Sequence, residues 1–190
     1  MPQWQEADAD QQINAKLIEE AQNGKVEAFG ELYERHAANV FRFIYSHLDN
    51  REDAEDLTEE VFFRVWRSIE NYSERGTPFA AYLFRVARNA LIDFYRRSSR
   101  MKPQVELEEN TLRDEHQDPG NLVAAQLEHR ELRQMLTQLR EDYRTVLQLR
   151  FLADLSPEET AQVMGKSSGA VRVLQHRALA ALRHLLDNKA

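Results

Sequence analysis

Acidic residues are concentrated in one short stretch of the N-terminal half of the chain. This acidic cluster comprises Asp53, Asp56, Glu59 and Glu60. Paired carboxylates can bind a metal ion or act as a general acid and base. The carboxylate metal sites of helical proteins, however, also use a Glu-x-x-His element, which this chain lacks. We therefore interpret the cluster as a docking surface for a basic protein partner.

The remaining composition gives no support to a metal, cofactor or catalytic site. The chain has no cysteine, and its six histidines show no metal-ligand spacing such as His-Glu-x-x-His. A phosphate-binding loop of the type Gly-x-x-x-x-Gly-Lys is also missing. We expect no metal, no cofactor and no enzymatic activity.

A basic stretch with aromatic residues follows the acidic cluster. At 100° per residue its polar positions form a stripe about a third of a turn from the apolar face. This polar stripe comprises Tyr82, Arg85, Asn89, Asp93 and Arg96. Arginine pairs with phosphate, aromatic rings stack on bases, and the turn before the stretch is long enough to hold an unstacked base. DNA contact is one interpretation, and a merely solvated helix face is the other.

The C-terminal part has the layout of a helix-turn-helix. Ser156, Pro157 and Glu159 form a helix-start signal, Gly165 ends that short helix, and Ser167 or Ser168 begins a longer one. On the longer helix Arg172, His176 and Arg183 point away from the apolar side, and Arg177 flanks them. Such a helix can enter the major groove, although its arginines could also be simply solvated.

Helical periodicity extends over most of the 190 residues, and no segment alternates as a strand does. Periodicity fades over residues 101–125, which are rich in acids and contain Pro103 and Pro119-Gly120. We predict an all-α protein with two small helical domains, residues 12–100 and 126–187, joined by a flexible acidic linker. The net charge of −7 reflects the acidic cluster and the linker and does not exclude local basic surfaces.

No apolar run is long enough to span a membrane, and the N-terminus lacks the basic and apolar regions of a signal peptide. We expect a cytoplasmic protein without membrane insertion.

The order of these elements resembles that of a bacterial extracytoplasmic-function (ECF) sigma factor, a member of the sigma-70 family. Three motifs carry the resemblance, and they lie in the segments 53–66 (DAEDLTEEVFFRVW), 79–97 (FAAYLFRVARNALIDFYRR) and 155–178 (LSPEETAQVMGKSSGAVRVLQHRA). The resemblance implies a sigma region 2 bundle and a sigma region 4 helix-turn-helix. It also implies a function in directing core RNA polymerase to the −10 and −35 promoter elements. Implied partners are the β′ and β subunits of the polymerase, promoter DNA and an anti-sigma factor.

The resemblance also implies roles for individual residues. The polymerase-binding residues would be Asp53, Asp56, Glu59 and Glu60. The −10 element would be bound by Tyr72, Arg75, Tyr82, Arg85, Arg88, Asn89 and Arg96, with the turn from Tyr72 to Thr77 holding a flipped base. The −35 element would be bound by Ser167, Ser168, Arg172, His176 and Arg177.

This chain departs from the family pattern at a few positions. Glu59 stands where Gln is frequent, Tyr82 where Trp is common, and Val173-Leu174 where a Ser-Arg pair is frequent. The usual −35 preference therefore does not follow. Two alternatives remain from the sequence: a sigma-like decoy that sequesters an anti-sigma factor, and a stand-alone helix-turn-helix regulator.

Overall fold

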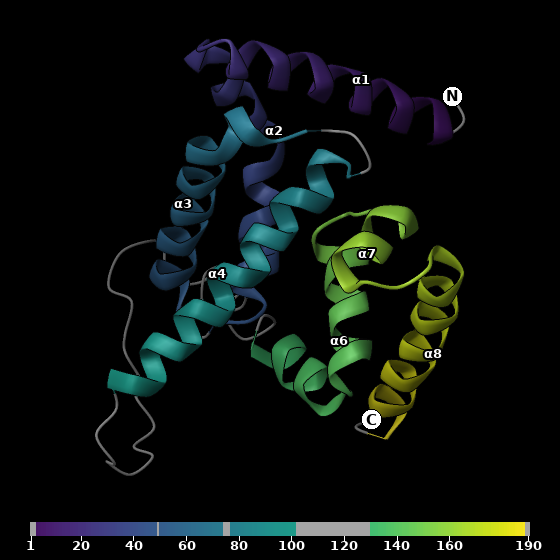
Figure 1. Cartoon of the computed structure of the whole chain (residues 1–190). Coiled ribbons are helices and arrows are strands. Elements are labelled where there is room, and N and C mark those ends of the chain that lie inside the picture. Colours follow the sequence, from purple (N-terminus) through teal and green to yellow (C-terminus); the bar gives the residue numbers. More distant parts are fainter. Residues whose placement is uncertain (1–2, 49, 74–76, 102–129, 189–190) are drawn as a thin grey trace, which may run out of the picture.

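The computed structural model describes residues 3–48, 50–73, 77–101 and 130–188, and every regular element in these ranges is a helix (Figure 1). The predicted all-α fold is confirmed. The N-terminal elements are α1 (Gln3–Gln22), α2 (Val26–Tyr45), α3 (Arg51–Ser68), the short 3-10 helix η1 (Ile69–Asn71) and α4 (Phe79–Met101). The C-terminal elements are α6 (Glu141–Leu147), η2 (Gln148–Leu152), α7 (Pro157–Met164) and α8 (Ser168–Asp187). Residues 130–138 are also helical. The predicted linker, apart from Met101, lies outside the described residues.

The N-terminal unit is a bundle held together by the apolar faces of α2, α3 and α4. On α3 the side chains of Ala54, Leu57, Val61 and Val65 are at most 2% exposed, as their helical spacing predicts. The helix begins where expected because Asn50 caps it, its side chain accepting a hydrogen bond from the Glu52 amide at 2.9 Å. Burying this stripe turns the acidic side of α3 outward.

Two helix starts differ from the sequence prediction. The helix α1 begins at Gln3, before the expected start of the domain at residue 12. The helix α4 begins at Phe79, and the Pro78 carbonyl accepts the bond from the Tyr82 amide at 3.1 Å. The pair Thr77-Pro78 is a helix-start signal that predicts Thr77 as the cap and Pro78 as the first helical residue, but the Thr77 hydroxyl instead accepts a hydrogen bond from Arg85. The start of α4 is therefore set one residue later than predicted, and Thr77 belongs to the turn.

The C-terminal unit is the predicted helix-turn-helix. Ser156 and Glu159 form the complete capping box of α7, and the helix ends at Gly165 in the left-handed conformation with φ of 65°. Ser167 caps α8, since its hydroxyl accepts a hydrogen bond from the Ala170 amide at 3.2 Å. These local signals fix the turn that separates the two helices.

The segment before α7 is less regular than its sequence pattern suggests. Here η2 is a π-helix, a rare form that inserts an extra residue into a helical turn. Asp154, just after it, adopts a positive φ of 57°, which Asp tolerates better than most residues. The Arg150 side chain donates to the Leu155 carbonyl across this bend and to Gln175 Oε1 at 2.9 Å. The bend thus redirects the chain into α7.

The two units pack directly against each other. Leu149, Ala153, Leu155 and Val163 of the C-terminal unit belong to the same buried apolar cluster as the core of the N-terminal bundle. A second cluster, around Val171, lies within the C-terminal unit. Figure 1 shows α7 beside α4, and η2 contacts α2. The sequence did not predict this shared core.

Polar contacts accompany the shared core. The Gln148 amide donates to the Ser46 hydroxyl at 2.9 Å in a buried position. Asn39 Nδ2 donates to the Ala153 carbonyl at 3.3 Å, and Arg42 Nε to the Leu152 carbonyl at 3.2 Å. Both carbonyls belong to the irregular bend at η2, so α2 satisfies backbone groups that this bend leaves without helical partners.

Candidate protein and nucleic-acid interfaces

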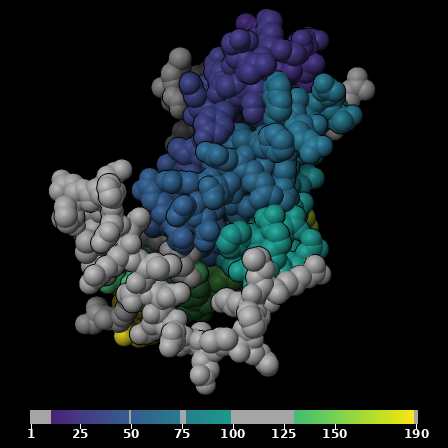
Figure 2. All heavy atoms as spheres, turned by 90° about the vertical axis from the view of Figure 1, so that its left-hand side faces the viewer, coloured from purple at the N-terminus to yellow at the C-terminus, as the bar shows by residue number. Residues whose placement is uncertain are grey.

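The acidic cluster borders an apolar hollow on the outer side of α3. The hollow has a volume of about 660 Å³ and is lined by Val26, Phe29, Asp56, Glu59, Glu60, Phe62, Phe63 and Trp66. Phe63 and Val26 are 60% and 62% exposed, which is unusual for large apolar side chains. Figure 2 views the molecule from the left-hand side of Figure 1, and α2 and α3 cover the middle of this face. An apolar floor with a carboxylate rim suits a partner that presents both apolar and basic side chains.

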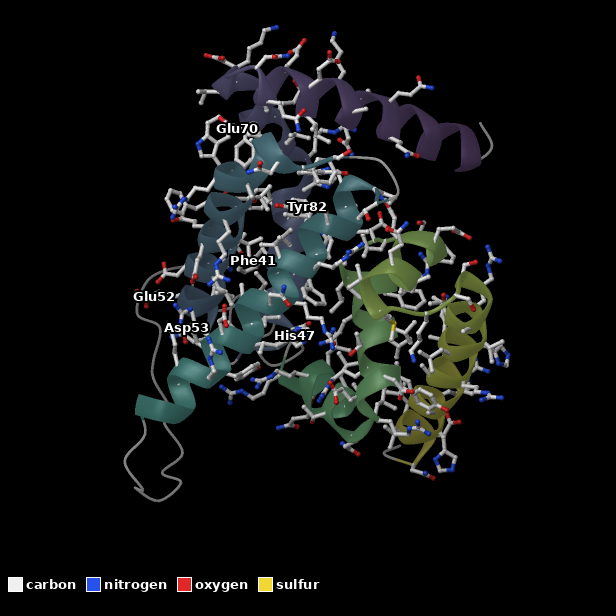
Figure 3. The ribbon with its side chains drawn as sticks, in the orientation of Figure 1. Phe41, His47, Glu52, Asp53, Glu70 and Tyr82 are labelled. Carbon is white, nitrogen blue, oxygen red and sulfur yellow. The ribbon has the colours of Figure 1, made fainter. Side chains whose placement is uncertain are left out.

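The four acidic residues do not occupy equivalent places. Asp56 and Glu59 are exposed, and Glu60 is half-buried. Asp53 does not line the hollow; it lies in the first turn of α3, where a carboxylate also stabilises the helix N-terminus (Figure 3). Three of the four predicted docking residues thus come together, and Asp53 lies beside them.

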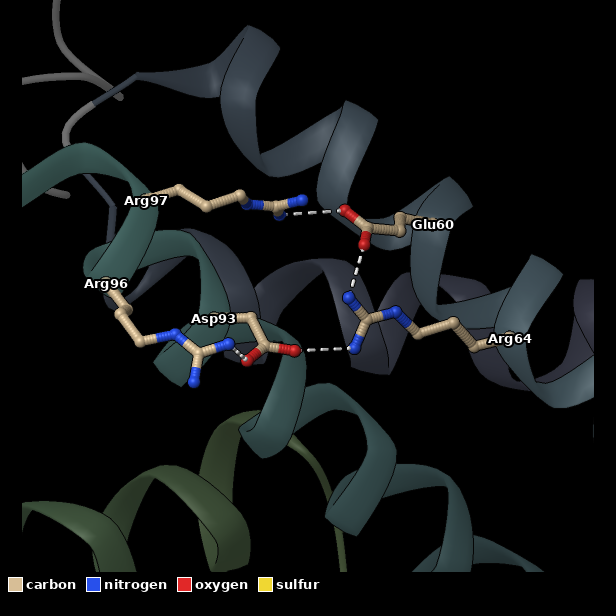
Figure 4. A network of polar contacts seen from close by, with 5 residues as sticks. All are labelled: Glu60, Arg64, Asp93, Arg96 and Arg97. Atoms are coloured by element: carbon tan, nitrogen blue, oxygen red, sulfur yellow. Dashed lines mark hydrogen bonds and ion pairs between the residues drawn. The ribbon is translucent and has the colours of Figure 1, made fainter. Parts of the chain in front are cut away.

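Glu60 takes part in an ion-pair network that joins α3 to α4 (Figure 4). Its two carboxylate oxygens contact Arg64 at 2.5 Å and Arg97 at 3.2 Å. Arg64 also contacts Asp93 at 3.1 Å, and Asp93 contacts Arg96 at 3.0 Å. Burial alone would raise the pKa of Glu60, but the hydrogen bonds and charges of the two arginines hold that pKa below its usual value. Glu60 is therefore ionised, and both of its carboxylate oxygens already contact arginines of the same chain.

The start of α4 carries an aromatic cluster beside the predicted base-holding turn. The Tyr72 and Tyr82 rings lie 4.8 Å apart between centroids, tilted by 36°, and Phe79 packs against both. The Tyr72 hydroxyl donates to the Thr77 carbonyl at 2.7 Å and so ties the two ends of the turn together. The Tyr82 hydroxyl lies 2.6 Å from that of Ser68. Arg75, predicted to contact the −10 element, lies outside the described residues.

The rest of the polar stripe runs along α4 and is partly covered by the C-terminal unit. Arg85, Asn89 and Arg96 of this stripe are exposed, and so is Arg88, a predicted −10 residue that does not belong to the stripe. Arg85 donates to the Gln162 side chain of α7 at 3.4 Å. Arg88 lines a second hollow of about 570 Å³ together with Arg140, Lys166 and residues of α6 and α7. The stripe is thus brought together as predicted, but in this arrangement α7 lies against part of it.

The predicted −35 residues lie on or beside the first half of α8. Arg172, His176 and Arg177 are exposed, while Val171 and Ala178 on the other side are buried. Ser167 is occupied as the helix cap, and Ser168 is the first residue of the helix. Arg172 pairs with Glu158 of α7 at 2.8 Å, and their side chains are 62% and 57% exposed. Exposed pairs are weak, so this pair leaves the arginine available to a stronger anionic partner.

Sequence reasoning missed several residues at these surfaces. Phe63 is not part of the apolar stripe predicted for α3, and no role is predicted for it from the sequence, yet it is 60% exposed and lines the hollow. Arg64 was not singled out, although its spacing of four residues from Glu60 on a helix is the signal of an ion pair. The contact of Glu60 with Arg97 crosses between helices and has no comparable sequence signal.

Metal and membrane sites gain no support from the structure. In the part of the chain that the structure describes, no group of three or more His, Asp or Glu side chains could hold a metal ion. Nor does any helix within the described ranges have the length and apolar character needed to cross a membrane.

Comparison with known proteins agrees with this architecture. The family model for sigma-70 region 2 matches residues 32–101, and that for sigma-70, region 4, matches residues 129–182. The chain is 37% identical to the ECF RNA polymerase sigma factor BldN of Streptomyces coelicolor, over 97% of this chain and 70% of that protein. It is 32% identical to the ECF RNA polymerase sigma factor ShbA of Streptomyces griseus, over 90% and 94% of the two chains.

Solved structures show the same fold. The structure of CnrH in complex with the cytosolic domain of CnrY matches with a TM-score of 0.73 and 27% identity, covering 94% of this chain and 99% of that one. The sigma factor RpoE from Bartonella quintana, solved in complex with the anti-sigma factor NepR, matches with a TM-score of 0.62 at 21% identity, covering 84% and 96%. This second likeness concerns the fold alone.

The chain therefore belongs to the ECF RNA polymerase sigma factors of the sigma-70 family. It directs RNA polymerase to promoters for transcription initiation, and its family is not enzymatic. The family, fold class and function predicted from the sequence are confirmed. The roles of individual residues and the domain bounds at 12–100 and 126–187 stay predictions.

Proposed function

We propose that the chain binds core RNA polymerase through the hollow on α3 and reads promoter DNA with two separate surfaces. The polar stripe of α4 and the turn from Tyr72 to Thr77 bind and open the −10 element. The exposed arginines of α8 bind the −35 element. The polymerase and the chromosome are the targets of this function, which therefore takes place in the cytoplasm.

The observation that carries the docking proposal is the combination of Phe63 with Asp56 and Glu59. A 60% exposed phenylalanine beside exposed carboxylates is costly to leave in water and gains from a partner that covers it. A polymerase segment that carries arginine or lysine next to apolar residues fits this surface. The carboxylates at the rim of the hollow would also speed the association of the chain with the polymerase.

Reconstitution with core RNA polymerase tests the proposal. The purified chain should make core polymerase initiate at specific promoters, and Asp56→Ala should weaken its binding to core without unfolding it, because Asp56 is exposed. Glu55→Ala is the matched control, since Glu55 is exposed on the same helix and pairs with Arg51 outside the hollow. Equal core binding by the two variants would refute the docking assignment.

We also infer that an anti-sigma factor regulates the chain. The inference rests on the similarity to CnrH, whose structure contains a second protein, the cytosolic domain of CnrY. A decoy that only sequesters such a factor has no need of DNA-facing arginines, and this chain keeps them on both α4 and α8. Failure to initiate at any promoter, together with tight anti-sigma binding, would favour the decoy instead.

A further inference from the structure

Asp93 is an acidic residue within the polar stripe of α4, whose other members are neutral or basic. An unpaired carboxylate at this position would repel the phosphates of DNA bound along the stripe. Each oxygen of Asp93, however, is paired with an arginine. Oδ2 contacts Arg64 of α3 at 3.1 Å, and Oδ1 contacts Arg96 of α4 at 3.0 Å (Figure 4). Asp93 thus joins an arginine from the neighbouring helix to an arginine of the stripe itself.

Arg64 lies behind Asp93, on the inner side of this contact. The side chains of Arg64 and Asp93 are each 33% exposed, whereas that of Arg96 is 63% exposed. Arg64 Nη1 donates to Asp93 and Nη2 donates to Glu60. Burial alone would lower the pKa of Arg64, but its hydrogen bonds to the two carboxylates and their charges hold that pKa above its usual value. Arg64 is therefore a fixed cation that reaches the outer surface through Asp93.

The packing of α3 against α4 does not depend on these polar contacts. Val61 and Val65 of α3 and Ala87 and Ala90 of α4 are fully buried in the same apolar cluster. Apolar burial is the main stabilising contribution in such a bundle, and a partly exposed ion pair adds little to it. The specific effect of Arg64 is therefore on the charge and orientation of the side chains that face outward.

We propose that Arg64 is a positioning residue for −10 recognition, because it holds the Asp93 carboxylate that in turn orients Arg96 toward DNA. The inference rests on the proposed function of the polar stripe. With Arg64 in place, these three residues carry one net positive charge, and a single Asp93 oxygen holds Arg96. Without Arg64, Asp93 and Arg96 would form a pair with no net charge. Both carboxylate oxygens would then compete with DNA for the same guanidinium group.

The test is a double-variant cycle on Arg64 and Asp93. Arg64→Met keeps the helix propensity of the residue but has neither charge nor N–H donors, and Asp93→Asn keeps the shape but removes the charge that Arg64 compensates. The full chain is added at concentrations that saturate core polymerase, so that weaker folding or docking does not change the amount of holoenzyme. This holoenzyme is titrated with the non-template −10 strand of a promoter on which the wild type initiates. Arg51→Met is the matched control, because Arg51 pairs with Glu55 at 2.7 Å and this pair lies entirely within α3.

We expect Arg64→Met to weaken strand binding about three- to fivefold when Asp93 is present, the upper range for one partly exposed ion pair. In the Asp93→Asn background the same change should alter binding by less than about twofold, because no carboxylate remains to be compensated. Arg51→Met should bind as the wild type does, and Arg96→Ala should bind more weakly. If Arg64→Met does not fold, Arg64→Lys replaces it. Lysine keeps the charge but lacks the planar fork that reaches both carboxylates, so a smaller loss should show the same dependence on Asp93.

The possible failures are distinguishable. Equal losses from Arg64→Met with and without the Asp93 charge, or no loss at all, would refute the positioning role of Arg64. The proposed function of the stripe would stand in that case, provided that Arg96→Ala still weakens binding. Unchanged binding by Arg96→Ala would instead refute DNA contact by this part of the stripe, and the inference with it.

Discussion

Removing the acceptor of the buried Gln148 amide should cost more stability than removing the amide itself. Gln148 is 1% exposed and Ser46 is 7% exposed. The Ser46 hydroxyl accepts from Gln148 at 2.9 Å and donates to the Phe43 carbonyl at 2.7 Å. The Gln148 Oε1 atom is buried and accepts no hydrogen bond within the described residues.

The magnitudes follow from which groups remain unpaired. Ser46→Ala leaves the Gln148 amide buried without its acceptor, which costs about 1–3 kcal/mol in the free energy of unfolding. The Phe43 carbonyl stays satisfied because His47 Nδ1 lies 2.8 Å from it. Gln148→Met removes the donor together with the unpaired carbonyl oxygen at nearly constant shape, so its cost should stay within about 1 kcal/mol.

Denaturant unfolding of the full chain measures this difference in the wild type, both single variants and the double variant. In the Gln148→Met background, Ser46→Ala no longer leaves an unpaired amide, so most of its cost should disappear. The coupling free energy should be about 1–2 kcal/mol. Equal costs of Ser46→Ala in both backgrounds would refute this explanation and show that the two groups do not depend on each other.

Two further predictions concern protonation and DNA reading. Burial, aided by the charges of Arg144, Arg133 and Arg88 and opposed by a hydrogen bond to Phe43, lowers the pKa of His47 from 6.5 to about 4. Between these pH values the unfolded chain binds a proton that the folded chain does not. The contribution of His47 to the free energy of unfolding should therefore be constant above pH 6.5 and fall by about 3 kcal/mol as the pH drops to 4. Unfolding measured across this range should show the fall in the wild type, and a similar fall in His47→Gln would contradict it. Arg172→Ala should weaken binding to −35 duplex DNA by about 1–3 kcal/mol if Arg172 reads a base. An equal loss on a scrambled duplex would instead indicate a phosphate contact.

Local signals made much of the fold predictable. The α3 stripe was found because its apolar residues recur at helical spacing, and burial of Ala54 and Val61 confirms it. The start of α7 was found because Ser156, Pro157 and Glu159 act within a single turn. These signals act between residues that are close in sequence, and for this reason the helix-turn-helix and its outward arginines could be placed without a structure.

Contacts between distant segments could not be predicted in this way. Gln148 lies 102 residues from Ser46, and nothing in the pattern around either residue indicates the other. The π-helix has no periodic signature, so the sequence predicts an ordinary helical pattern over residues 148–152. The docking surface was predicted only as a set of acids, because Phe63 lies on the acidic side of α3, off the apolar stripe, and a single apolar residue on a polar face does not by itself indicate a binding surface.

The π-helical segment also limits how the length of the chain can vary. Residues 146–149 are buried one after another, with Val146 and Leu147 in the C-terminal core and Leu149 in the core shared with α2. Adjacent helical residues point about 100° apart, so this short segment fills two cores from different sides. Insertion of one residue between Leu147 and Leu149 would turn Leu149 by that angle and move it out of the shared core. In this segment the number of residues is therefore as constrained as their identity.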